Sequence, residues 1–62
     1  DFLTVKQREV LELAVSRGYY EDDSEVTLKQ LADELGIARS TIGEHLKRAE
    51  SEVVKKAIKD FN

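Results

Sequence analysis

The sequence contains no cysteine and no proline, and its only histidine is His45. Without cysteine it can form neither a disulfide nor a thiolate metal site. It also lacks a glycine-rich phosphate loop and a second histidine at metal-ligand spacing, and Glu44 and His45, being neighbours, would point apart on a helix. We therefore expect no enzyme, metal site or cofactor. His45 is expected at a helix–helix seam or at a phosphate.

Long apolar runs are also missing. No stretch approaches the roughly 20 apolar residues that cross a bilayer, and no signal segment is visible. The lack of cysteine fits a reducing interior, so we expect a cytoplasmic protein with no membrane partner. The 62 residues form one domain, and a start at Asp1 suggests a piece of a longer protein.

The net charge of −3 argues against a generic nucleic-acid binder, which is usually basic. The charge is unevenly distributed, however. Residues 1–36 carry four basic and nine acidic side chains, a net −5, whereas residues 37–62 carry six basic and four acidic ones, a net +2. The basic excess is small, so nonspecific affinity for DNA should be weak and sensitive to salt.

Two T-x-x-Q capping boxes predict where helices begin. Thr4 and Gln7 open a helix expected over residues 5–17, and Gly18 follows its last apolar position. One or both of the tyrosines after Gly18 are expected to pack the ring over the core and expose the hydroxyl, with base stacking as the alternative. The acidic loop 21–25 lacks the spacing of a calcium-binding loop and should point away from DNA.

The second box, Thr27 and Gln30, opens a helix expected over residues 28–35 that stops at Gly36. A third helix follows over residues 39–60, although Ala38 is a poor cap. The apolar periodicity allows either one helix or two nearly collinear ones. A helix, a short turn and a second helix at this spacing predict an all-α fold: a helix-turn-helix domain of three to four helices, without a wing and with a long C-terminal helix.

The far end of the third helix carries more apolar residues than a small domain can cover. We expect them to pack on Phe2 and the first helix, on a second copy, or on the rest of a parent chain. The second copy is the prediction we adopt, a homodimer through the C-terminal helix. Its interface would comprise Val53, Val54, Ala57, Ile58 and Phe61.

The remaining face of the third helix is suited to duplex DNA. Its first turn carries Arg39, which can donate to guanine, and Ser40, which can bond either base, while Glu44 can accept from cytosine. Gly43 would remove bulk close to the groove floor. Phosphate contacts are expected from the start of the second helix and from the flanks of the third. These phosphate candidates are Thr27, Lys29, Gln30, Thr41, Lys47 and Arg48. A solvated helix face is the alternative for each.

Three segments also resemble a known family: L-T-x-x-Q-R-E-V-L at 3–11, R-G-Y-Y at 17–20, and V-T-L-x-x-L-A-D-E-L-G-I-A-R-S-T-I-G-E-H-L-K-R-A-E at 26–50. Together they resemble the helix-turn-helix domain of bacterio-opsin activator type regulators, which are mostly archaeal. More distantly, they are similar to response-regulator DNA-binding domains and to region four of sigma factors. Family members often have Ser where this chain has Ala38.

The resemblance implies the C-terminal DNA-binding domain of a transcription regulator whose N-terminal domain senses a signal. It also implies that the helix starting near Arg39 contacts the bases. Two other functions stay open at this point. One is a protein-interaction or dimerisation module that has lost DNA binding, and the other is promoter recognition of the sigma type.

Overall fold

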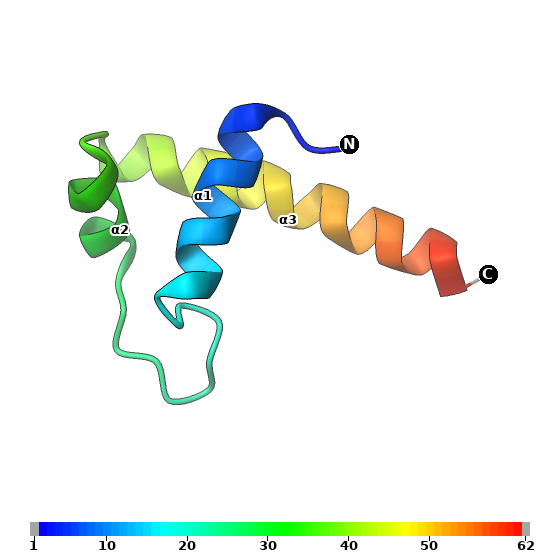
Figure 1. Ribbon diagram of the computed structural model, residues 1–62, viewed down its shortest axis with the longest axis horizontal. Helices are drawn as coiled ribbons and strands as arrows, with labels where there is room; N and C mark the ends of the chain where they lie inside the picture. The colour runs from blue at the N-terminus through cyan, green and yellow to red at the C-terminus, as the bar shows by residue number, and fades with distance from the viewer. Residues whose placement is uncertain (1, 62) are drawn as a thin grey trace.

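The computed structural model describes residues 2–61, which form three helices and no strand. Helix α1 spans Val5–Ser16, α2 spans Leu28–Leu35 and α3 spans Arg39–Phe61 (Figure 1). The all-α prediction with a long C-terminal helix is confirmed. The choice between one and two C-terminal helices is also settled, because α3 is continuous over 23 residues.

Both T-x-x-Q boxes form as predicted and fix the starts of α1 and α2. The Thr4 hydroxyl accepts from the Gln7 amide at 3.1 Å, and the Gln7 side chain accepts from the Thr4 amide at 3.1 Å. In α2 the corresponding distances between Thr27 and Gln30 are 3.1 and 2.8 Å. Each box satisfies two amides that a helix start would otherwise leave without a partner.

Two glycines end α1 and α2 in the left-handed conformation, with φ of 77° at Gly18 and 70° at Gly36. The residue after each glycine donates its amide back into the helix, Tyr19 to the Ala14 carbonyl at 2.9 Å and Ile37 to the Ala32 carbonyl at 3.0 Å. This arrangement satisfies carbonyls at the helix end and reverses the chain. The reversal at Gly36 sets the direction in which α3 departs.

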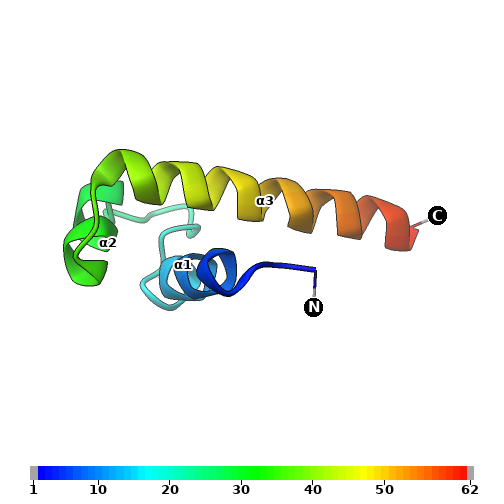
Figure 2. The ribbon, with the colours of Figure 1, turned by 90° about the horizontal axis from the view of Figure 1, so that it is seen from above.

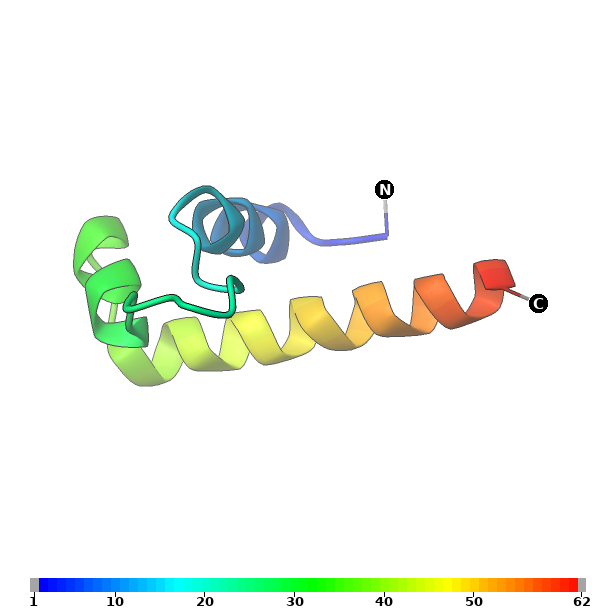
Figure 3. The same ribbon diagram turned by 90° about the horizontal axis from the view of Figure 1, so that it is seen from below.

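Helices α1 and α2 both pack against α3, with α2 at its N-terminal end (Figures 1 and 2). The core they enclose is small, and each large side chain within it contributes about 1.5–3 kcal/mol by leaving water. Its buried members are Val10, Ala14, Leu31, Ala32, Ile42 and Leu46. Seen from below, the C-terminal half of α3 extends past the other two helices (Figure 3).

That extension leaves the end of α3 only partly covered. Phe2 lies beside it, but on the side formed by Glu52 and the lysines 55, 56 and 59 rather than on the apolar row. Of the expected cover by Phe2 and the first helix, α1 contributes Leu11 and Val15, which line a groove with Val53 and Val54. Within residues 2–61, no helix is both long and apolar enough to cross a membrane.

Candidate nucleic-acid interface

The turn at Gly36 holds α3 against α2 so that one side of α3 is buried and the other is free. Ile42 and Leu46 are fully or almost fully buried and face the first two helices. At about 100° per residue, the side chains on the opposite side of this segment point to solvent. The exposed residues on that side are Ser40, Thr41, Glu44, Lys47 and Arg48, and Arg39 is exposed in the first turn, on the stripe of Ile42 and Leu46. Of the residues predicted on α3 for DNA contact, all but Gly43 are therefore exposed.

The charges on this surface are partly paired. Arg48 and Glu44, one turn apart, form an ion pair of 2.8 Å. Among residues 2–61, Arg39 and Lys47 form no ion pair. The two unpaired cations and a third held by Glu44, all exposed on the N-terminal half of α3, can accept an anionic backbone.

Gly43 differs from its prediction. It is half-buried, and a Cβ added there would lie 3.8 Å from Cδ1 of Leu28. The position therefore faces α2 at the helix seam rather than the most exposed line of α3. This is ordinary van der Waals spacing, so the close packing of α2 on α3 does not itself require glycine.

The start of α2 uses two of its candidate side chains internally. Thr27 and Gln30 are exposed, but both are engaged in the capping box. Lys29 is exposed and pairs with Asp33 at 2.8 Å. The hydrogen bond to Asp33, and then its charge, raise the pKa of Lys29. Any anion bound here would therefore meet the positive end of the helix and an already paired lysine.

His45 is half-buried on α3, in line with the expected seam position. Within the described part of the chain, no group of three histidine, cysteine or acidic side chains could hold a metal ion.

Two polar contacts between distant residues were not anticipated. Arg17, at the end of α1, donates from Nε to Glu34 of α2 at 3.0 Å and from Nη2 to the other carboxylate oxygen. This hydrogen-bonded pair lowers the pKa of Glu34 and raises that of Arg17. Tyr20 donates its hydroxyl to Glu50 of α3, and burial, followed by that bond, raises the pKa of Tyr20.

The ring of one tyrosine packs over the core, as the prediction allowed. Tyr19 packs against the core, and its ring meets that of Tyr20 edge to face at 5.1 Å. The Tyr20 hydroxyl, however, bonds a carboxylate instead of pointing freely to water. Sequence separations of 17 and 30 residues gave no signal for either polar contact.

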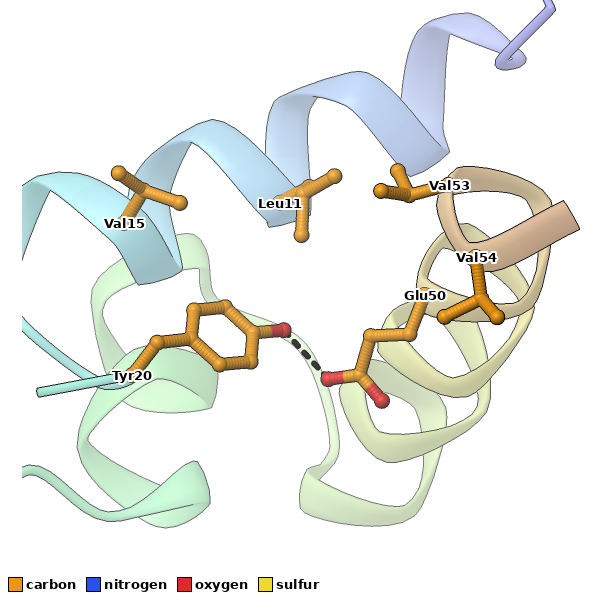
Figure 4. A pocket seen from close by; sticks show the side chains of 6 residues that line it. All are labelled: Leu11, Val15, Tyr20, Glu50, Val53 and Val54. Atoms are coloured by element: carbon orange, nitrogen blue, oxygen red, sulfur yellow. Dashed lines mark hydrogen bonds between the residues drawn. The ribbon is translucent and has the colours of Figure 1, made fainter. Parts of the chain in front are cut away.

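The residues predicted for dimerisation lie on the extended half of α3. All but Ala57, which is half-buried, are exposed, and Phe61 is 80% exposed. Two members of the row, Val53 and Val54, also line an open groove with Leu11, Val15, Tyr20 and Glu50 (Figure 4). The groove connects the row to α1, the first helix, which was one of the three covers expected from the sequence.

The fold and this surface define a DNA-binding helix-turn-helix domain. Residues 3–55 match the family described as HTH DNA binding domain, and the chain belongs to this bacterio-opsin activator type family of transcription regulators. It is a family of DNA-binding regulators rather than of enzymes.

Several relatives are haloarchaeal regulators. The chain is 46% identical over 54 residues to the transcriptional regulator NarO of Haloferax volcanii, covering 87% of the chain and 26% of that protein. It is 41% identical over 51 residues to a dimethyl sulfoxide reductase transcriptional activator of the same organism, covering 82% and 24%. A Halobacterium salinarum protein of that description is 40% identical over 55 residues, covering 89% and 25%.

The chain thus spans about a quarter of the length of these relatives. No solved structure gives a significant match.

Proposed function

We propose that the chain binds specific sequences of double-stranded DNA, with the N-terminal half of α3 in the major groove. The observation that carries the proposal is the exposed surface of α3, where Arg39 and Lys47 form no ion pair with any of residues 2–61. A helix with this position in the motif contacts base edges through its first turns, while its partner helix crosses the backbone.

The roles follow from position on the helix. Arg39 and Ser40, in the first turn, contact bases, and Glu44, held by Arg48, accepts from a cytosine amine. Lys47, Thr41 and Arg48 on the flanks contact phosphates. Gly43 has no part in this contact, because it faces α2 at the helix seam.

At the second helix, the backbone amides of the first turn receive a phosphate. Thr27 and Gln30 hold that turn in shape through the capping box, and Lys29 adds charge. Thr27 and Gln30 therefore act by shaping the start of α2, and their side chains stay in the capping box when the phosphate binds.

At the level of the whole protein, the chain acts as the DNA-binding part of a longer cytoplasmic regulator, with a sensory domain preceding it and two copies pairing through α3. The greater length of the regulators it matches supports the first point. The exposed row at Val53, Val54, Ala57, Ile58 and Phe61 supports the second.

The test is selection of binding sites from a randomised duplex library, followed by anisotropy titration of the enriched duplex. Arg39→Ala should weaken binding about 5- to 150-fold and relax selectivity at one guanine, because a bidentate contact is worth about 1–3 kcal/mol of discrimination. Lys6→Ala, an exposed lysine on α1, is the matched control. Enrichment of no sequence, or unchanged affinity for Arg39→Ala, contradicts the proposal.

The apolar row favours one second candidate, a pairing module that no longer binds DNA. That function predicts tight self-association together with no DNA binding even at low salt, which the same titration measures.

A further inference from the structure

The open groove between α1, Tyr20 and α3 has a volume of about 390 Å³. Figure 4 shows Leu11 and Val15 of α1 facing Val53 and Val54 of α3 across it, with the Tyr20–Glu50 hydrogen bond along one edge. Val15 and Val54 are 62% and 59% exposed. Water therefore contacts the apolar side chains that line the groove. The polar groups at its edge, those of Tyr20 and Glu50, already bond each other.

The groove continues into the apolar row. Val54, Ala57, Ile58 and Phe61 are spaced three, one and three residues apart, which puts them on one side of α3. Val54 lies in the groove at one end of this side, and Phe61 is exposed at the other. Ala57 stands between them, small enough for a second helix to approach closely.

We propose that a second copy of the chain covers this surface, with the two α3 helices antiparallel and crossing between Ala57 and Ile58. In this register Phe61 of each copy lies opposite Val54 of the other and fills its groove. The inference deepens the pairing offered with the proposed function and rests on it. The aromatic ring that the fold leaves most exposed on α3 thereby gains apolar contacts on Leu11, Val15 and Tyr20.

The register also suits a two-fold DNA site. The exposed DNA face and the apolar row lie about a quarter of a turn apart on α3, so both DNA faces point along the two-fold axis. With the helices crossing at about 50°, the base-contacting segments are held about 40 Å apart. Half-sites one duplex turn apart are separated by about 34–36 Å.

Single-cysteine cross-linking tests the register, because the native chain has no cysteine. Three variants are needed: Val54→Cys, Ile58→Cys and Phe61→Cys, treated with a short bis-maleimide. We expect Ile58→Cys to cross-link to itself. We expect Val54→Cys and Phe61→Cys to cross-link only when they are mixed. Self-cross-linking of Val54→Cys indicates a parallel pair and overturns the proposal, as does the absence of cross-links in all samples.

Sedimentation equilibrium tests the filling of the groove. Phe61→Ala should raise the dimer dissociation constant at least about tenfold, as expected for an aromatic anchor in a pocket. Phe2→Ala, the other phenylalanine, is the matched control and should leave it within about twofold. Equal effects of the two changes overturn the proposal. A monomer that still selects one DNA sequence overturns the pairing alone, whereas a cross-linked dimer that selects none overturns the proposed function.

Discussion

At the scale of single residues, the ends of the helices are the most constrained positions. Thr4 and Thr27 each hold an amide at a helix start, and Gly18 and Gly36 each adopt a positive φ at a helix end. The third glycine, Gly43, is helical and has no such requirement. Two of the three glycines are therefore required by a positive φ, and the third is not.

Substitution of Gly36 and Gly43 by alanine should change stability in opposite directions. Gly36→Ala forces a Cβ into the left-handed region, which costs about 1–2 kcal/mol. Gly43→Ala improves helix propensity by about 1 kcal/mol and meets Leu28 only at ordinary contact distance. Urea unfolding followed by circular dichroism measures both changes. Equal destabilisation by the two substitutions would disprove this account.

Residue chemistry also sets how much of the fold could be predicted. Capping boxes and glycine stops are local, so Thr27 and Gly36 fix the bounds of α2 from the sequence. The ion pair of Arg17 with Glu34 depends on the angle between α1 and α2, which periodicity does not contain. The same limit applies to Gly43, whose direction toward Leu28 follows from the packing of α2 on α3.

At the scale of elements, α1 and α2 pack on α3, and the Arg17–Glu34 ion pair connects their C-terminal ends. Both side chains are exposed, so solvent screens the pair and its contribution is small. Its pH dependence is nevertheless distinctive. The pKa of Glu34 is lowered in the folded chain, chiefly by the hydrogen bond from Arg17, so the pair stabilises the fold above the ordinary glutamate pKa of 4.5.

Glu34→Gln should therefore lower the urea midpoint at neutral pH, and the difference should vanish as the pH falls through the lowered pKa of Glu34. Parallel urea titrations at neutral and acid pH measure this. Glu12→Gln is the matched control, because Glu12 pairs with Arg8 within α1 and does not connect two helices. A difference between Glu34→Gln and the parent chain that persists in acid contradicts the prediction.

At the scale of the whole molecule, an acidic protein must bind a polyanion. The net charge is −3, and four of the acidic groups lie in the loop at residues 21–25. Most of the lysines and arginines are already paired with carboxylates one turn away. Binding must therefore depend on few phosphate contacts, and their number can be counted from the effect of salt.

Lys47→Ala should reduce the slope of log affinity against log salt by about 1, because each phosphate contact releases close to one counterion. The measurement is an anisotropy series in rising potassium chloride on the selected duplex. Lys6→Ala should leave the slope unchanged. A slope that is identical in the parent chain and in Lys47→Ala shows that Lys47 does not touch a phosphate.

Helix α3 runs without a break from Arg39 to Phe61, so it has no joint between its two halves. Under the proposed pairing, the length of α3 fixes the distance between the two DNA-contacting ends. One residue added to its middle would advance one half by about 1.5 Å and turn it by about 100° against the other. The length of this helix and the spacing of the operator could then change only together.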